Sequence, residues 1–204
     1  MEKDIKISRA TLQRYPIYLK ALTKIKSLGI TRILSSQLGE YVSIKPTTIR
    51  RDLSLIGNLG KQGYGYDVDA LIEIFQGQLG NNYDEKIILI GCGNFGKALL
   101  NYNKWNDVVG EIVCAFDKYP DNIKASVPVY NIKDISKYMP KNCHIALLCI
   151  SDDVDDTVKL LADNGITGIV DFTREHFTTP KGVTVKSVDL VSSIQELVFI
   201  ANNI

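Results

Sequence analysis

Residues 87–100 read Ile-Ile-Leu-Ile-Gly-Cys-Gly-Asn-Phe-Gly-Lys-Ala-Leu-Leu, and these fourteen residues are the strongest indication of fold in the sequence. Four aliphatic residues lead into Gly-x-Gly-x-x-Gly and then into helix-forming residues, a pattern typical of the strand, tight turn and helix of a dinucleotide-binding βαβ unit. In such a unit Gly91 allows the sharp turn, Gly93 lets the backbone approach a diphosphate, and Gly96 lets the helix pack closely on the strand. Amide groups at the start of the helix attract the phosphates. The stretch therefore predicts a Rossmann-type α/β domain with a parallel sheet.

Asp117 occupies the position at which dinucleotide-binding units carry an acidic residue. Asp117 lies 21 residues beyond Gly96, at the end of the apolar run 112–116. In dinucleotide-binding domains an acid about 20 residues after the glycine turn holds the adenosine ribose. The glycines alone leave open a tight strand-to-helix turn that binds no nucleotide, but together with Asp117 they favour dinucleotide binding.

Composition indicates a globular protein. The 204 residues, 45% of them apolar, allow one large domain or two small ones. No apolar run reaches the length of a membrane span, and the first residues lack the apolar segment of a signal peptide. We therefore expect a cytoplasmic protein without a membrane-spanning segment.

The cysteines and histidines do not form a recognisable metal or catalytic motif. There is no Cys-x-x-Cys pair, so we expect buried, reduced thiols at Cys92, Cys114, Cys143 and Cys149. Neither His144 nor His176 has a neighbouring Cys, Asp or Ser spaced as a triad or a ligand set. The sequence therefore predicts no metal site and no enzyme.

Charge is distributed unevenly along the chain. The net charge is +1, but residues 1–66 carry twelve Lys or Arg against four acids, whereas residues 67–204 carry twelve against nineteen. A basic segment of this kind suggests a polyanionic partner, with nucleic acid as the leading candidate and a solvated surface as the alternative.

The basic segment has the pattern of a helix-turn-helix. Apolar spacing predicts a helix over 11–28, with Pro16 near its start or at a kink, then a short helix over 37–41 behind Ser35 and Ser36, and a third over 47–56 opened by Pro46. In the third helix an inward stripe of Ile49, Leu53 and Ile56 leaves hydroxyls and guanidinium groups on the other side, as phosphate and major-groove contacts require.

A glycine-rich hairpin follows that third helix. Residues 57–66 hold four glycines, a lysine at the tip and tyrosines on the far arm, which predicts the wing of a winged-helix domain, with Lys61 along a minor groove. Asp67 is expected to cap a last helix that ends at Leu79. We therefore predict a winged-helix domain over 1–80, a Rossmann domain over 83–187 and a C-terminal helix over 188–204.

The sequence resembles the Rex family of redox-sensing transcriptional repressors over nearly the whole chain. The shared segments, in chain order, are 50–54, 60–68, 91–99 with Tyr102, 116–117 with Pro120, 165–169 and 188–190. The resemblance implies a winged-helix domain joined to a Rossmann domain, and a homodimer with a swapped C-terminal helix. It also implies binding to a palindromic double-stranded DNA operator that depends on whether NADH or NAD⁺ occupies the Rossmann site.

The motifs and the resemblance together give three sets of candidate residues. The predicted cofactor-binding residues are Gly91, Cys92, Gly93, Asn94, Phe95, Gly96, Tyr102, Asp117, Lys118, Ile150 and Ser151. The predicted DNA-binding residues are Lys45, Thr47, Thr48, Arg50, Arg51, Ser54, Lys61, Gln62 and Tyr64. The resemblance implies that Lys20, Tyr102 and Asp189 couple the cofactor to the DNA-binding domain.

The rest of the second half continues the Rossmann pattern. Apolar runs predict further strands over 127–130, 145–150, 169–170 and 183–185, and a helix over 154–164 ended by Gly165. The tail from Leu190 to Ala201 is apolar over too wide an arc to lie exposed. The resemblance assigns its covering surface to a partner subunit.

Several residues depart from the family pattern. Ser151 and four acids at 152, 153, 155 and 156 follow a predicted strand where Val-Pro is usual. The acids either favour a helix N-terminus that Ser151 caps or face the crevice and repel an anionic cofactor. Other departures are Asp171, Lys20 in place of an arginine, and Gln62 in place of the wing arginine, which removes a phosphate contact.

Lys118, directly after Asp117, raises the choice between NAD(H) and NADP(H). A 2′-phosphate would meet the Asp117 carboxylate unfavourably, so NAD(H) is the better interpretation and the Lys118 side chain is expected to reach solvent. Two other functions stay open: a Rex-like repressor that has lost or changed its ligand response, and a small NAD-dependent oxidoreductase whose basic segment only mediates dimer contacts.

Overall fold

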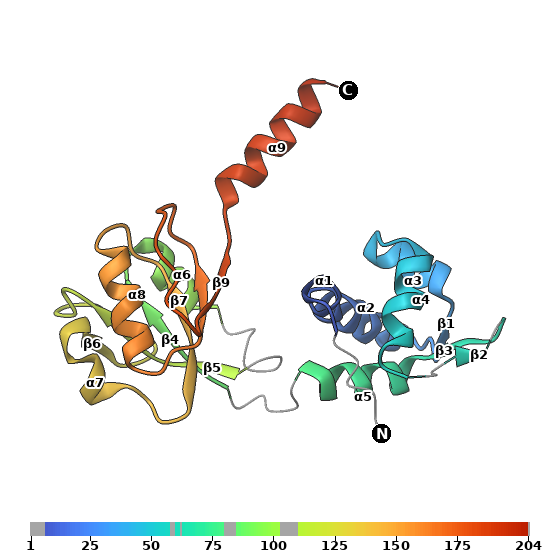
Figure 1. The fold of residues 1–204 in the computed structure, drawn as a ribbon, viewed down its shortest axis with the longest axis horizontal. Coiled ribbons are helices and arrows are strands. Elements are labelled where there is room, and N and C mark those ends of the chain that lie inside the picture. Colours follow the sequence, from blue (N-terminus) through green and yellow to red (C-terminus); the bar gives the residue numbers. More distant parts are fainter. Residues whose placement is uncertain (1–6, 58–59, 62, 80–84, 103–109, 204) are drawn as a thin grey trace. The chain divides into compact units, whose positions relative to one another are not determined.

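The computed structural model describes residues 7–57, 60–61, 63–79, 85–102 and 110–203. The chain divides into two compact units, Met1–Asn81 and Asn82–Ile204, coloured blue to green and green to red in Figure 1. Each unit has its own hydrophobic core. The units are therefore described one at a time.

The first unit has the elements of a winged helix. Its three-stranded antiparallel sheet has the order β1-β3-β2. The pairing of β1 with the hairpin places the wing beside the helical core. In chain order the elements are α1 (Arg9–Leu12), α2 (Tyr15–Ser27), β1 (Arg32–Ile33), α3 (Ser35–Val42), α4 (Pro46–Ser54), β2 (Gly60–Lys61), β3 (Gly65–Asp67) and α5 (Val68–Leu79).

Proline positions explain where two of these helices begin. Pro16 lies in the first turn of α2, and because a proline inside a helix clashes with the carbonyl four residues earlier, the predicted helix over 11–28 is split into α1 and α2. Pro46 is the first residue of α4. The short helix predicted over 37–41 begins earlier than expected, since α3 starts at Ser35. The Gln37 side-chain oxygen accepts the Leu34 N–H at 2.9 Å at this helix start.

The core of the first unit is aromatic and aliphatic. Tyr15 and Tyr18 of α2 pack on Phe75 of α5, with ring centroids 5.0 and 5.7 Å apart. The predicted cap on α5 is confirmed, because the Asp67 carboxylate accepts the Ala70 N–H at 3.0 Å. Helix α5 is thereby fixed at its start and along its buried face.

The second unit is a doubly wound parallel sheet with the strand order β6-β5-β4-β7-β8-β9. The predicted α/β fold with an N-terminal winged helix and a C-terminal helix is confirmed. In chain order the elements are β4 (Glu85–Ile90), α6 (Asn94–Leu100), β5 (Gly110–Asp117), β6 (Val129–Asn131), the 3₁₀ helix η1 (Ile132–Asp134), α7 (Ile135–Tyr138), β7 (Cys143–Leu148), α8 (Val154–Asp163), β8 (Gly168–Asp171), β9 (Thr184–Ser187) and α9 (Leu190–Asn202).

Helices cover both faces of this sheet. Ile88 and Ile90 of β4 belong to the cluster that contains residues of α7 and α8, whereas Ile87 and Leu89 belong to the cluster that contains Leu100 of α6. This alternation follows from the two-residue side-chain period of a strand. The four-residue aliphatic run was therefore the sequence signal of a strand buried on both faces.

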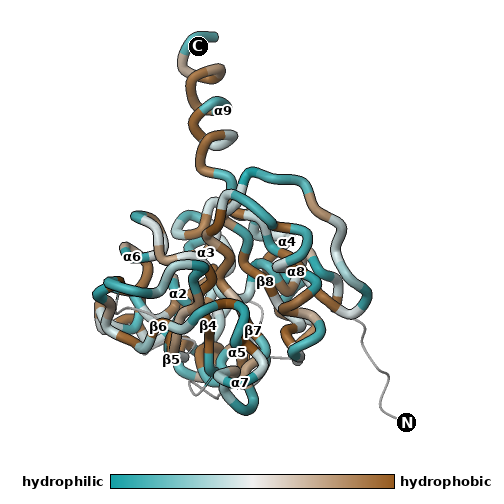
Figure 2. The backbone as a smooth tube through the Cα atoms, turned by 90° about the vertical axis from the view of Figure 1, so that its left-hand side faces the viewer, coloured by the Kyte–Doolittle hydropathy of each residue, from teal (hydrophilic) through white to brown (hydrophobic). Residues whose placement is uncertain are grey.

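Helix α9, unlike the strands and helices around the sheet, buries none of its apolar side chains. It extends away from the sheet of its own unit in Figure 1 and is coloured hydrophobic along much of its length in Figure 2. Every described residue of α9 is exposed, including Ile194, Leu197 and Phe199. An apolar surface of this kind indicates a contact with another protein surface.

Candidate functional site

The first candidate site is the exposed side of α4. Ile49 and Leu53 are buried, whereas Thr48 is half-buried and the other candidates on or beside this helix are exposed. The predicted inward stripe is confirmed at Ile49 and Leu53. Exposed α4 candidates are Lys45, Thr47, Arg50, Arg51 and Ser54.

Helix α4 also carries a buried charge that sequence reasoning missed. Asp52 is 1% exposed. Its Oδ2 accepts hydrogen bonds from Arg14 Nε at 2.6 Å and from the Tyr18 hydroxyl at 2.7 Å. Its Oδ1 accepts from Arg14 Nη2 at 2.7 Å and from the Thr11 hydroxyl at 3.2 Å. The bidentate pair fixes the rotation of α4 about its own axis, which decides which residues face outward.

The wing is supported from β1. Arg32 donates hydrogen bonds from Nε to the Tyr64 carbonyl and from Nη2 to the Gly65 carbonyl, and its guanidinium lies 4.7 Å from the centroid of the Tyr64 ring. Tyr64 is 68% exposed. Lys61 lies in β2, and Gln62 lies outside the described residues. Arg32 therefore holds the far arm of the hairpin in place.

The second candidate site is the glycine turn between β4 and α6. Gly91 has φ +93°. A Cβ on Gly96 would stand 2.0 Å from the Gly91 carbonyl oxygen, so the helix lies directly against the turn. A Cβ on Gly93 would meet nothing within 4 Å, which leaves open space beside the backbone. This geometry is that of a diphosphate-binding turn.

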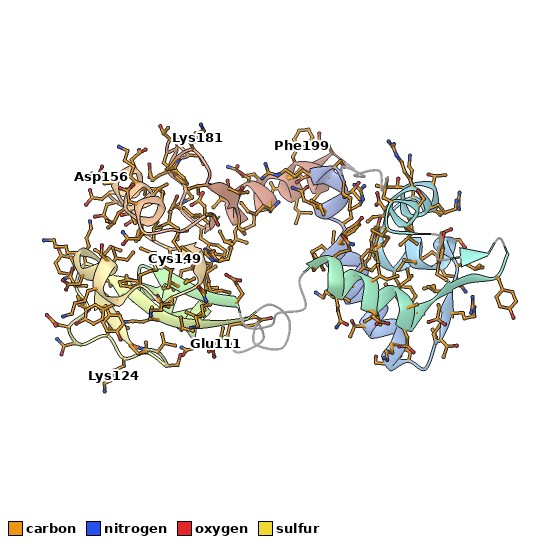
Figure 3. The ribbon with its side chains drawn as sticks, turned by 60° about the horizontal axis from the view of Figure 1, so that its bottom comes forward. Glu111, Lys124, Cys149, Asp156, Lys181 and Phe199 are labelled. Atoms are coloured by element: carbon orange, nitrogen blue, oxygen red, sulfur yellow. The ribbon has the colours of Figure 1, made fainter. Side chains whose placement is uncertain are left out.

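A cavity of about 340 Å³ opens beside this turn. Seven of the predicted cofactor-binding residues line it: Gly91, Gly93, Phe95, Asp117, Lys118, Ile150 and Ser151. Cys92, Asn94, Gly96 and Tyr102 are not among its lining residues. Cys149, another lining residue, directly follows β7 and is labelled in Figure 3.

The sequence predicted Phe95 but not Phe172 in the wall of this cavity. Phe172 follows β8, Phe95 is the second residue of α6, and their ring centroids lie 5.0 Å apart. Ile132 and Thr157 also line the cavity. Apolar residues in loops carry no periodic signal, so only the strand order could have placed Phe172 at this edge of the sheet.

Asp117 ties the glycine turn to β5. Its Oδ2 accepts the Cys92 N–H at 2.7 Å, and its Oδ1 accepts the Tyr119 N–H at 2.9 Å. A carboxylate offers about four lone-pair positions, so Asp117 retains acceptor capacity for a ribose hydroxyl while it holds the turn.

The Lys118 side chain reaches solvent in part, as expected, but its ammonium is held in ion pairs. Its ammonium donates to Asp152 and, at 2.7 Å, to Asp153, and the side chain is 35% exposed. The acids do lie at a helix start, with Asp155 and Asp156 in the first turn of α8, but the expectation that Ser151 caps this helix is wrong. The N-cap of α8 is Asp153, which makes no side-chain capping bond. Asp152 lines the cavity, but its charge is paired with Lys118.

Asp171, another departure from the family pattern, is buried and is not a lining residue of the cavity. Its carboxylate accepts the Thr173 N–H at 2.8 Å and the Ser187 hydroxyl at 2.9 Å. These bonds hold the end of β9 against β8.

The three predicted coupling residues occupy both units. Lys20 is exposed on α2, and Tyr102 follows α6 in the second unit. Asp189 caps α9, since its carboxylate accepts the N–H groups of Val191 and Ser192 at 2.9 and 3.0 Å. Hydrogen bonds from Ser192 lower the pKa of Asp189. The coupling itself stays a prediction.

The four cysteines are free thiols, as the sequence predicted; Cys92, Cys114 and Cys143 are buried as expected, whereas Cys149 is half-buried. Burial raises the pKa of Cys92 and of Cys143 to about 11, and that of Cys114 and of Cys149 to about 12. Since the thiolate is the reactive form, these residues are poor nucleophiles at neutral pH.

The described ranges hold neither a cluster of metal ligands nor a helix that could cross a membrane. No three His, Cys, Asp or Glu side chains there gather as metal ligands would. No helix in those ranges combines the length and apolar character that a membrane crossing requires.

Comparison with protein families divides the chain in the same way. Residues 6–54 match the family described as "Putative DNA-binding protein N-terminus". Residues 82–175 match the family described as "CoA binding domain". The first match includes all of α4, and the second includes the glycine turn and the cavity.

Full-length relatives agree with both matches. The redox-sensing transcriptional repressor Rex of Oenococcus oeni is 38% identical over 213 residues, covering 100% of this chain and 96% of that protein. Rex of Limosilactobacillus reuteri strain DSM 20016 is 36% identical, covering 97% and 95%. These relatives are named as repressors, which favours that interpretation over the oxidoreductase.

Solved structures give the same result. RSP in complex with β-NAD⁺ and operator DNA has a TM-score of 0.87 and 29% identity, covering 96% of this chain and 93% of that one. RSP in complex with β-NADH has a TM-score of 0.85 and 27% identity, covering 97% and 95%. Fold, glycine turn and full-length relatives lead to one conclusion: this chain belongs to the Rex family of redox-sensing transcriptional repressors.

Proposed function

We propose that this protein represses transcription by binding a palindromic DNA operator through α4 and the wing, and that NAD(H) in the cavity of the second unit controls that binding. The observation that carries the proposal is the presence, in one chain, of an exposed basic helix and an open diphosphate-binding turn. NADH and NAD⁺ have the same diphosphate and adenosine, so the aromatic end of the cavity is where the two redox forms are distinguished.

The proposal assigns roles to the predicted residues. The glycine turn binds the diphosphate, Asp117 binds the adenosine ribose, and Phe95 and Ile150 contact the cofactor from the cavity wall. Arg50 and Arg51, with the hydroxyls of α4, contact the operator, and Tyr64 and Lys61 contact it from the wing. Lys20, Tyr102 and Asp189 transmit the state of the cofactor.

We further propose that the protein is a cytoplasmic homodimer. The exposed apolar side chains of α9 support it, because a surface of this kind is covered in a stable protein. The winged-helix domain over 1–80, the Rossmann domain over 83–187 and the swapped helix over 188–204 are the parts of each subunit. Two winged helices related by a two-fold axis read half-sites about 34–36 Å apart, or a multiple of that spacing.

Substitution of an α4 arginine tests the DNA-binding half of the proposal. The test duplex is one that the wild-type protein selects from a randomised pool. We expect Arg51→Ala to weaken binding to this duplex by at least about tenfold, since one good base or phosphate contact contributes about 1–3 kcal/mol. Gel shifts at several salt concentrations measure it.

The matched control is Lys24→Ala, which removes one exposed positive charge from α2. We expect it to change the affinity less than threefold. Equal losses in the two variants would contradict a specific role for α4 and indicate only a general effect of net charge.

A further inference from the structure

An ion-paired cluster crosses the end of the strand that carries the glycine turn. In the sheet, β5 and β7 lie on opposite sides of β4. Lys118 directly follows β5, and Asp152 and Asp153 follow β7. The Lys118 ammonium donates to both carboxylates, at 2.7 Å to that of Asp153. We call these three residues the Lys118 clasp.

The clasp belongs to the wall of the cavity. Lys118 and Asp152 line it together with Gly91 and Gly93 of the turn. Ligands of open α/β sheets bind at this edge, beyond the carboxyl ends of the strands. The cluster therefore lies where a dinucleotide enters and not on a remote surface.

The local backbone directs Asp153 toward Lys118. Asp153 occupies the N-cap position of α8 with φ +52°, and its carboxylate makes no capping bond to the helix. It accepts from Lys118 instead. Hydrogen bonds to Asp152 and Asp153 raise the pKa of Lys118, so the ammonium stays charged while the two carboxylates neutralise it.

Lys118 also stands at the position that decides between two cofactors. Asp117, one residue earlier, is the acid that holds a ribose hydroxyl, and a cation near that acid can instead accommodate the 2′-phosphate of NADP(H). A free Lys118 would supply that cation. In the clasp its charge is already paired, and the cluster of one cation and two carboxylates has a net charge of −1.

We propose that Asp152 and Asp153 set cofactor choice by holding Lys118 away from the adenosine ribose, so that the cavity accepts NAD(H) and rejects NADP(H). The proposal deepens the proposed function and rests on it. Asp117 alone repels a 2′-phosphate, and the clasp pairs the charge of Lys118, a neighbouring cation that would otherwise offset this repulsion.

Neutralising both acids tests the proposal. In the full-length protein we expect Asp152→Asn with Asp153→Asn to raise the ratio of NADPH affinity to NADH affinity at least about tenfold, or about 1.4 kcal/mol. Asparagine keeps the side-chain shape and tolerates the left-handed backbone at position 153. Titration calorimetry with each nucleotide measures the ratio.

A third substitution separates release of Lys118 from simple loss of negative charge. We expect the gain to disappear when Lys118→Ala is added to the double variant, and Lys118→Ala alone not to raise the ratio. The control is Asp156→Asn, which removes an acid on the outer side of α8 whose side chain is 88% exposed and which is labelled in Figure 3. It should leave the ratio within twofold of the wild-type value.

The outcomes distinguish the two proposals. An unchanged ratio in the double variant, or a gain that survives Lys118→Ala, would overturn the clasp proposal while NADH binding by the wild type upholds the proposed cofactor. Failure of the folded wild type to bind either nucleotide would overturn the proposed cofactor and the clasp proposal with it.

Discussion

Asp52→Ala is expected to destabilise the winged-helix unit by about 3 kcal/mol, because removal of the buried partner of a partly buried ion pair leaves the other partner uncompensated. Arg14 would lose a bidentate acceptor, and the buried Tyr18 hydroxyl would lose its hydrogen bond. Hydrogen exchange of the full-length protein, resolved by segment, measures the effect. Amide protection in α2 and α4 should fall about 100-fold.

The control lies in the same unit. Asp69 pairs with Lys26 at 2.6 Å, but both side chains are more than half exposed. Exposed pairs contribute less than about 1 kcal/mol, so Asp69→Ala should change protection less than about fivefold. Equal effects of the two substitutions would show that the Asp52 network does not fix α4.

The same network gives the stability of α4 a defined dependence on pH. Burial of Asp52 opposes its ionisation, but hydrogen bonds from Arg14, Tyr18 and Thr11 outweigh that effect and hold its pKa below the ordinary value. The contribution is therefore complete above the unfolded pKa of about 3.9 and is lost as the pH falls through the lower pKa of the folded state. Hydrogen exchange measures the free energy of local opening of α4 in the wild type and in Asp52→Asn. The difference between the two values should be constant from pH 7 to about 5 and shrink in stronger acid.

Two alanine substitutions in the glycine turn should have different consequences. Gly96→Ala places a Cβ 2.0 Å from the Gly91 carbonyl oxygen, which forces α6 off the turn. We expect a loss of about 1–3 kcal/mol in the stability of the second unit, together with loss of NADH binding.

Gly93→Ala is the matched variant, because its Cβ meets nothing within 4 Å and its φ of −64° suits any residue. We expect unchanged protection of β4 and α6, and an NADH affinity at least about tenfold lower, since the methyl group occupies the space beside which the diphosphate passes. Calorimetry and hydrogen exchange measure the two effects. Normal NADH affinity in Gly93→Ala would contradict the assigned diphosphate position.

The elements that the sequence predicted well are those with a local signal. The glycine turn, its flanking strand and Asp117 lie within one βαβ unit, and the inward stripe of α4 follows from helical spacing. The tail over 190–201 was recognised from its apolar arc alone. In each case a short stretch of chain contains the whole pattern.

The elements that the sequence did not predict depend on contacts between distant residues. Asp52 pairs with Arg14 over 38 positions, and Lys118 pairs with Asp152 over 34. Strand β1 has only two residues and exists because it pairs with β3. Phe172 reaches the cavity only because β8 lies next to β7 in the sheet. Periodicity in the sequence carries no information about such pairs.

The proposed function joins a DNA-binding unit and a dinucleotide-binding unit in one chain. To shift an evenly balanced equilibrium strongly, NADH must favour one state of the dimer by several kcal/mol in total over its two sites. A ligand that binds both states equally shifts nothing. NADH and NAD⁺ must therefore differ in their effect on the affinity for DNA, and not only in their own affinities.

Fluorescence anisotropy of a labelled palindromic duplex bound to the protein measures the effect of each nucleotide on the affinity for DNA. We expect NADH to release the duplex and NAD⁺ at equal occupancy to leave it bound. Gly93→Ala should bind the duplex normally but need at least about tenfold more NADH to release it. A duplex that stays bound when calorimetry shows both sites filled with NADH would contradict control of DNA binding by NADH.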